Sequence, residues 1–338
     1  MSSTTTFPLR FGSPAYNVSE NPTAPEFDLI DRIRRRAPGR DDVILGIGDD
    51  AAIVQVPPGK QLVIAADTIN RGIHFPDNTA PADIGWKSLA VNLSDLASMG
   101  AEPAWCTLSL SLPTGDAEWV DSFLDGFLEL AALHRVALIG GDTTRGPLSV
   151  SVTVHGFVEP GRALLRSGAR EGDDVWVTGT LGEATAALTQ WQAGAIVDPV
   201  LRMRLDRPTP RLVAAMRIAG IAHACIDVSD GLLADLQHIC VASRVGADVE
   251  LDALPALPEL VVAFETQRRQ AIQATGGDDY ELCFTAAWSA RDEIARIAVA
   301  TDTPITRIGR IVAGQGTRAL RGDGSEWVPP SAGFVHFA

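Results

Sequence analysis

The sequence has 338 residues, which is enough for two domains that each bury a core. Hydrophobic residues make up 46% and charged residues 21%, as in ordinary globular proteins rather than disordered or fibrous ones. The formal net charge is -14 and the longest basic run is residues 34–36, so a nucleic-acid partner is not expected. No apolar run approaches the roughly 20 residues of a membrane span, so no membrane partner is expected either.

The four cysteines lie far apart without CxxC spacing, so the sequence predicts neither a disulfide framework nor a zinc site. We therefore expect a reducing, cytoplasmic location. Residues 1–25 are rich in Ser, Thr, Pro and Asn and lack the apolar centre of a signal peptide, so they are predicted to form a flexible tail.

Aspartate lies beside glycine at four separate places, and the first is GIGDDAA at residues 46–52. Clustered carboxylates repel one another unless a cation lies among them, and glycine lets the backbone approach a ligand closely. The simpler interpretation of this motif alone is a turn, because Gly and Asp are the usual turn residues. The alternative is that the aspartates of this motif bind a metal ion.

A helix is predicted from about Ala82 to Met99, apolar around most of its circumference. Ser88, Asn92 and Asp95 lie on one stripe of this helix. A buried carboxylate is costly without a partner, and an anion near a helix C-terminus is disfavoured by the helix dipole. Metal ligation by Asp95 is therefore favoured over a capping role.

Residues 107–113 and 149–158 alternate polar and apolar side chains with period two, which predicts strands with one buried face. The other, polar face could lie against a partner subunit. Residues 119–134 between them predict an amphipathic helix. The second aspartate motif, GGDTT, follows an apolar strand at 136–139 and places Asp142 at the end of that strand, although a simple turn is equally consistent.

The stretch 172–184 opens a second unit, in which strands and helices alternate to the C-terminus. We therefore predict an α+β N-terminal domain at residues 26–159 and an α/β C-terminal domain at 160–338.

The third motif, DVSDG, precedes a patterned helix. Ser229 or Asp230 can serve as its N-cap, and a helix N-terminus also attracts phosphate, with Asp227 and Asp230 in metal-bridged contacts.

The fourth motif, GGDDYE at residues 276–281, reads as a loop before a strand, and His74 also lies in a predicted loop. The common phosphate-binding and kinase signatures, GxxxxGK[ST], GxGxxG, HRD and DFG, are absent from the sequence. If phosphates bind, metal ions and scattered backbone groups must hold them.

Taken in order, these motifs resemble those of the thiamine-monophosphate kinases, a family within the aminoimidazole ribonucleotide synthetase-like superfamily. The series runs GIGDD, DTINRGIHF, KSLAVNLSDLASMGAEP, LIGGDTTRGP, RSGAREGD, IDVSDGL, GGDDYELCF and GFVHF, from about residue 27 to 337. The resemblance implies transfer of the ATP γ-phosphoryl group to thiamine monophosphate, giving thiamine diphosphate and ADP. It also implies two α/β domains and a homodimer joined through the N-terminal strands.

By motif, the resemblance implies several Mg2+ ions held by Asp50, Asp67, Asp95, Asp142, Asp227 and Asp230. It implies ATP contacts at Gly141, Arg166 and Ser229, and thiamine contacts at His74, Asp278 and Phe334. Catalysis is expected to depend on Asp50, Asp95, Asp142 and Arg166. The acceptor phosphate is already charged near neutral pH, its second pKa being about 6, so direct in-line attack needs no general base.

The chain departs from the family pattern at two places. Ala65 and Ala66 stand where Ser or Thr usually precedes the DT motif, and Asp278 stands where Glu is usual. The first removes a side-chain oxygen near the metals, and the second shortens a substrate contact. Two other functions stay open: another ATP-dependent enzyme of the superfamily, such as a dehydratase or cyclo-ligase, and a catalytically silent binding protein.

Overall fold

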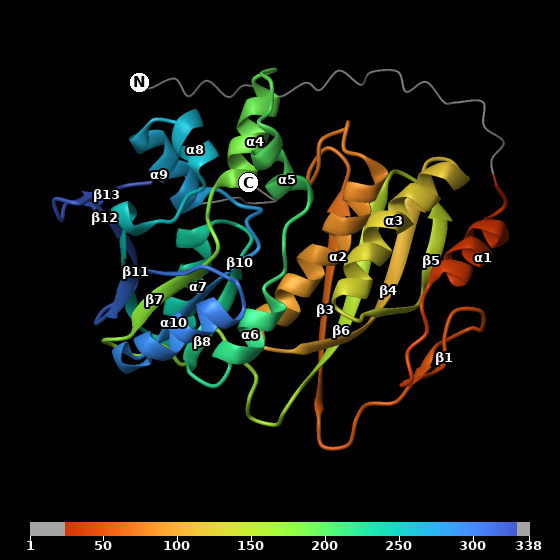
Figure 1. Ribbon diagram of the computed structural model, residues 1–338, viewed down its shortest axis with the longest axis horizontal. Helices are drawn as coiled ribbons and strands as arrows, with labels where there is room; N and C mark the ends of the chain where they lie inside the picture. The colour runs from red at the N-terminus through yellow and green to blue at the C-terminus, as the bar shows by residue number, and fades with distance from the viewer. Residues whose placement is uncertain (1–23, 330–338) are drawn as a thin grey trace, which may run out of the picture.

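The computed structural model describes residues 24–329, arranged as two large sheets with their helices side by side and one small two-stranded sheet (Figure 1). Almost all of the predicted tail, and Phe334, lie outside the described residues. Residues 24–329 contain no helix long and apolar enough to cross a bilayer.

The first region runs from red to yellow-green in Figure 1. Its elements are α1 (Glu26–Arg36), β1 (Val43–Leu45), β2 (Ile53–Val54), β3 (Gln61–Asn70), α2 (Pro81–Ser98), β4 (Glu102–Leu112), α3 (Ala117–Leu133), β5 (Ala137–Arg145) and β6 (Ser149–Val158). Four strands form a sheet in the order β3-β6-β4-β5, in which β4 and β5 are parallel and the other pairs antiparallel.

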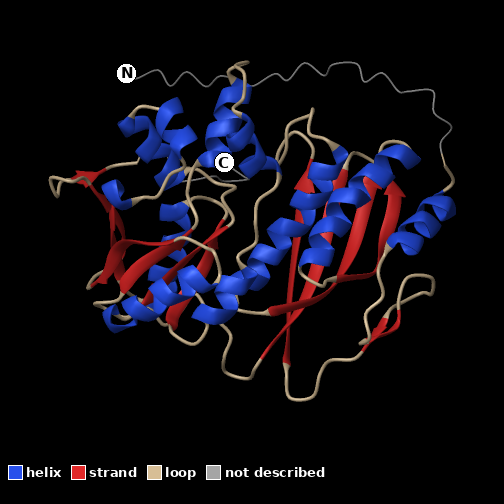
Figure 2. Cartoon of the chain, viewed as in Figure 1, coloured by secondary structure: helices blue, strands red, loops and turns tan. Residues whose placement is uncertain are grey.

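Helices α2 and α3 cover one face of this sheet (Figure 2). The period-two pattern of β6 produces that face, because Val150, Val152 and Val154 are almost completely buried. The alternate residues of β6, which are Ser, Thr and His, are only partly buried. The prediction of a half-polar strand at residues 149–158 is therefore confirmed.

The opposite face of the four-stranded sheet is largely open. The β1-β2 hairpin covers one end of it, where Trp105 and Phe157 are buried. Further along, the apolar side chains of Leu62 and Ile64 on β3 are 41% and 57% exposed. This face carries apolar, hydroxyl and acidic side chains. Asp142 of β5, for example, pairs with Ser109 of β4.

The second region contains β7 (Asp174–Thr178), α4 (Glu183–Gln192), α5 (Pro199–Asp206), α6 (Leu212–Ile218), β8 (Ala222–Val228), α7 (Leu232–Ser243), β9 (Gly246–Glu250), α8 (Pro258–Ala263), α9 (Thr266–Thr275), β10 (Glu281–Ala286), α10 (Arg291–Ala300), β11 (Ile305–Val312), β12 (Gly316–Leu320) and β13 (Glu326–Trp327). The seven-stranded sheet has the order β13-β12-β9-β11-β7-β10-β8. Its pairs are antiparallel except β9 with β12. The predicted mixed α/β class is confirmed, while strand direction was not evident from the alternation of elements.

One apolar cluster joins the two regions, because residues of α2 and α3 share it with Trp176, Leu212 and Phe284 of the second region. Helix α2 contacts β3 and β6 on one side and β8 and α6 on the other. Helix α2 is therefore packed between the two regions and contacts both of them. The domain boundary predicted after residue 159 falls in the connection between β6 and β7 and stays a prediction.

One local expectation was wrong. The GGDTT motif does not follow a strand but forms part of β5, so Asp142 lies within the strand rather than at its end. The reason is the parallel pairing with β4, which continues from Ala137 to Arg145. A Cβ atom at Gly141, where φ is +147°, would lie 1.8 Å from the Leu108 carbonyl oxygen, so glycine allows this close approach.

Candidate active site

A cleft of about 500 Å³ lies between the two regions. Strand β3, the loop after it and helix α2 form one side. The segment around Arg166, the β8-α7 loop and the loop before β10 form the other. Most of the predicted site residues meet here: Asp67, His74, Asp95, Arg166, Asp227, Ser229, Asp230 and Asp278.

Three predicted residues lie elsewhere in this chain. Asp50 is exposed in the β1-β2 loop, and Gly141 and Asp142 are on β5, at the opposite edge of the sheet from Asp67 on β3. Three strand spacings separate these edges, about 14 Å in total. A shallow hollow lined by Ile47, Gly141 and Asp142 places the first aspartate motif close to the second.

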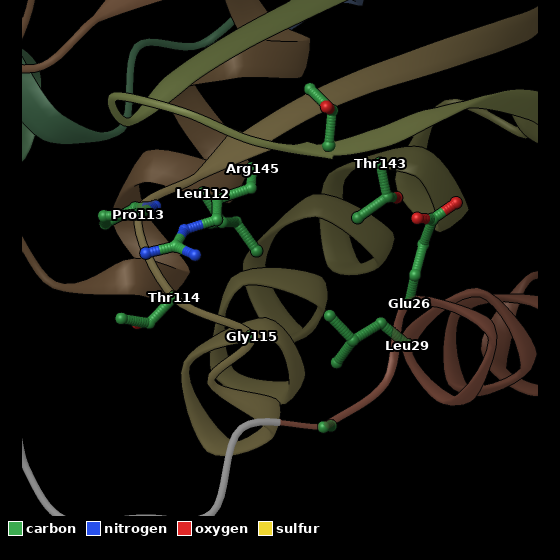
Figure 3. Close-up of a pocket in the computed structure, with 10 residues that line it drawn as sticks. Glu26, Leu29, Leu112, Pro113, Thr114, Gly115, Thr143 and Arg145 are labelled. Carbon is green, nitrogen blue, oxygen red and sulfur yellow. The ribbon is translucent and has the colours of Figure 1, made fainter.

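Next to Asp142 is a separate hollow of about 380 Å³ (Figure 3). The end of β4 and the following turn line one side, and Glu26 and Leu29 of α1 line another. Thr143 and Arg145 of β5 also contribute. Two of the four acidic motifs, DVSDG and GGDDYE, therefore line the main cleft, and the other two, GIGDD and GGDTT, lie near the β5 edge.

The polar stripe of α2 holds strand β3 in place. The Asn92 side chain accepts a hydrogen bond from the backbone N–H of Asp67 at 2.7 Å and donates one to the Ser88 carbonyl at 2.9 Å. Asp95, one turn further along, lines the cleft. Ala65 and Ala66 precede Asp67 on β3 and offer no side-chain oxygen there.

Asp227 is the penultimate residue of strand β8 and is only 5% exposed. Its carboxylate accepts a hydrogen bond from the Ser94 hydroxyl at 2.8 Å, which bridges the two regions. Ser94 did not emerge from the sequence analysis, although it directly precedes Asp95. The available signal was its place next to Asp95 on a helix whose other polar residues already formed a stripe.

The carboxylates of the cleft disfavour one another's charge. Burial and the nearby Asp227 and Asp67 raise the pKa of Asp95 to about 8. Burial, and to a lesser degree Asp67, raises the pKa of Asp227 to about 6, against the Ser94 hydrogen bond, which lowers it. The Arg166 guanidinium lowers both pKa values. The site therefore has more negative charge than its own arginine offsets.

Among residues 24–329, no three acidic, histidine or cysteine side chains converge as a complete metal-binding group. The donor set nevertheless fits a hard divalent cation, since all its charged donors are carboxylates in one cleft, and burial together with neighbouring carboxylates raises the pKa values of Asp95 and Asp227. Asp67, Asp95, Asp227 and Asp230 are the residues of the cleft that could hold Mg2+.

The His74 end of the cleft depends on a buried lysine that the sequence analysis missed. Lys87 is 1% exposed and donates to the His74 carbonyl at 2.9 Å and to the Asp278 carboxylate at 3.0 Å. The second oxygen of Asp278 accepts from the Tyr280 hydroxyl, also at 3.0 Å. The Asn70 backbone N–H donates to Nδ1 of His74 at 3.0 Å, which fixes the imidazole ring. The shorter Asp278 is thus held in a defined position.

Comparison with known proteins first defines the class. Residues 48–158 match the AIR synthase related protein N-terminal domain, and residues 170–321 match the corresponding C-terminal domain. The thiamine-monophosphate kinase of Escherichia coli K12 is 43% identical over 323 residues, covering 93% of this chain and 98% of that protein. The chain belongs to the thiamine-monophosphate kinase family.

Comparison with solved structures points to the same family. The thiamine-monophosphate kinase of Stenotrophomonas maltophilia K279a has 54% identity and a TM-score of 0.84, covering 89% of this chain and 98% of that one. A structure of AaThiL complexed with AMPPCP and TMP has 30% identity and a TM-score of 0.74, covering 92% and 96% of the two chains.

Proposed function

We propose that this protein transfers the γ-phosphoryl group of ATP to the phosphate of thiamine monophosphate, giving thiamine diphosphate and ADP. The observation that carries the proposal is the single cleft in which an acidic cluster with Arg166 lies beside the His74 and Asp278 end. A relative that covers most of this chain has been solved with AMPPCP, an ATP analogue, and TMP.

The acidic cluster forms the nucleotide end of the cleft. Asp67, Asp95, Asp227 and Asp230 are the residues that would hold Mg2+ there, and bound Mg2+ would supply positive charge beside the polyphosphate. Arg166, which lines the cleft and is exposed, adds a guanidinium that can pair with phosphate oxygens. Ser229 offers a hydroxyl donor to the same phosphates.

The other end of the cleft fits the acceptor. Ile73 and Leu188 give it apolar walls suited to the two rings of thiamine, and His74 and Asp278 give it polar contacts. The buried Lys87 donates hydrogen bonds to the His74 carbonyl and to the Asp278 carboxylate and so fixes both residues. An acceptor bound here presents its phosphate toward the acidic cluster and Arg166.

Positioning is the main requirement of the reaction. The acceptor phosphate is already an anion and needs no base to activate it, since its second pKa is about 6. Two anions must instead be brought together, so Arg166 and the metal-binding carboxylates carry the catalytic role. We infer direct in-line transfer without a phosphoenzyme.

The division of the acidic motifs supports a homodimer. The sheet has an open face and two free edges, β3 and β5, and closed pairing with a second copy removes both edges. Such pairing joins β3 of one protomer to β5 of the other. The partner subunit's Asp142 and the partner subunit's Asp50 then approach the cleft beside Asp67, which a single chain cannot achieve. The site is complete only in the dimer.

We place the protein in the cytoplasm, because its four cysteines are free and buried, as expected for a chain that works in a reducing compartment.

Product analysis tests the proposed reaction. Purified protein with ATP and Mg2+ should release ADP only when thiamine monophosphate is added, with one thiamine diphosphate formed for each ADP. Release of ADP without thiamine diphosphate would favour another ATP-dependent enzyme of the superfamily. Binding of both ligands by calorimetry without ADP release would favour a silent binding protein.

A further inference from the structure

We propose that Asp235 is a positioning residue for the nucleotide end of the cleft. Its buried carboxylate occupies the backbone N–H groups of the loop 229–231, so this loop contacts the nucleotide through its side chains and not through its amides. The inference deepens the proposed function and rests on it.

The carboxylate lies in the first turn of α7 and is 3% exposed. A single oxygen, Oδ2, accepts hydrogen bonds from three consecutive N–H groups: from Ser229 at 3.0 Å, and from Asp230 and Gly231 at 3.1 Å each. The helix has Gly231 at its N-cap position, where no side chain caps it, so the expected N-cap role of Ser229 or Asp230 is not realised. Asp235 instead satisfies the N–H groups of the loop that precedes the helix.

The carbonyl side of the same loop is fixed as well. The N–H of Asp278 donates to the Ser229 carbonyl at 2.9 Å, and the N–H of Tyr280 donates to the Val228 carbonyl at 2.8 Å. A Cβ atom at Gly231, where φ is +124°, would lie 2.7 Å from the Thr275 carbonyl oxygen, so the loop has little room to shift. Both sides of the loop backbone are therefore engaged by the protein itself.

This arrangement differs from the usual phosphate site at a helix N-terminus. There the free N–H groups point at the bound anion. Here an internal carboxylate occupies the N–H groups of the loop before the helix, and Ser229 and Asp230 line the cleft. Loss of the Asp235 charge frees the three donors and loosens the two side chains, so the nucleotide and metal contacts weaken most. The acceptor end changes less, because Lys87 also holds His74 and Asp278.

The test compares Asp235→Asn with Asp248→Asn in the full-length protein. Asp248 is a matched control, because it is a 4% exposed carboxylate of the same region, bonded to Arg318 at 2.9 Å and absent from the cleft lining. For Asp235→Asn we expect the KM for ATP and the half-saturating Mg2+ concentration to rise by about tenfold or more. The KM for thiamine monophosphate should change less than about twofold. Asp248→Asn should lower the Tm without moving any of these values.

A folded Asp235→Asn protein with unchanged ATP and Mg2+ dependence would overturn the proposal, as would equal effects on both substrates. A measurement on the wild-type protein covers the case in which the variant does not fold. Amide hydrogen exchange at residues 229–231 should be slow without nucleotide and stay unchanged when AMPPCP and Mg2+ are added. Protection that arises only on adding nucleotide would show phosphate on these amides and refute the role of Asp235. Wild-type protein that forms no thiamine diphosphate would instead refute the proposed reaction, and the exchange experiment would still decide on Asp235.

Discussion

Replacing Asp95 by asparagine should stabilise the metal-free protein at pH 8 and at the same time lower its turnover. Burial, with the nearby Asp227 and Asp67, raises the pKa of this carboxyl group from 3.8 to about 8. The folded state therefore binds the proton more tightly than the unfolded state. The resulting stability is fully present below about pH 4 and is lost as the pH rises through about 8. Asparagine has no proton to lose, so the stability gap between variant and wild type should widen from pH 5 to pH 8.

The size of the effect follows from the two pKa values. The difference between 3.8 and about 8 corresponds to about 6 kcal/mol for a group that titrates alone. Asp95 is only partly buried and shares its titration with Asp227, so we expect roughly 2–3 kcal/mol in practice. Bound Mg2+ should reverse the order, because the wild type gains a ligand charge that the variant lacks.

Thermal unfolding followed by circular dichroism, at pH 5 to 8.5 in EDTA and in Mg2+, measures these differences. In parallel, kcat of the variant should fall by about 100-fold or more, since a metal ligand contributes several kcal/mol to stabilising the charge of the transition state. An Asp95→Asn protein that is less stable than wild type at pH 8 in EDTA would refute the electrostatic account. Wild-type kcat in that variant would show that Asp95 is structural.

Three further substitutions test other parts of the site. Gly141→Ala should destabilise the protein by about 2–4 kcal/mol, because the new Cβ atom would lie 1.8 Å from a carbonyl oxygen of β4, and an unchanged Tm would contradict this close approach. Mixing inactive Asp95→Asn and Asp142→Asn proteins, with exchange of subunits, should restore about a quarter of wild-type activity if each site takes Asp142 from the partner; no recovery would mean that one chain supplies both residues. Lys87→Met leaves Asp278 without its buried cation, so the KM for thiamine monophosphate should rise by about tenfold or more while the KM for ATP stays within about twofold. Equal changes in both KM values would contradict a separate acceptor end.

Local sequence patterns were sufficient for elements whose structure depends on their own residues. The period-two alternation at residues 149–158 gave β6 with the observed bounds. Two of the four aspartate and glycine motifs, DVSDG and GGDDYE, marked loops that line the cleft. Helix α2 was predicted within one residue at each end, from about Ala82 to Met99 against the observed Pro81–Ser98. Its polar stripe includes Asp95, which lines the cleft, while the metal ligation predicted for Asp95 stays a prediction.

The contacts that organise the site were not accessible in this way. Lys87 meets Asp278 across 191 positions of sequence, and Ser94 meets Asp227 across 133, so no local pattern reports either pair. Asp142 was misplaced at a strand end, because the parallel pairing that extends β5 depends on β4, a separate part of the chain. Asp235 is close in sequence to the loop that it holds, but the general preference for Ser and Asp at N-caps pointed to other residues.

The central claim is that one cleft holds both substrates and passes the phosphoryl group directly between them. ATP made chiral at the γ-phosphorus, with stereochemical analysis of the thiamine diphosphate formed, tests this most directly. A single in-line transfer predicts product of inverted configuration, together with intersecting initial-rate plots. Net retention of configuration, with radiolabelled protein after incubation with γ-labelled ATP alone, would contradict direct transfer and require a phosphoenzyme.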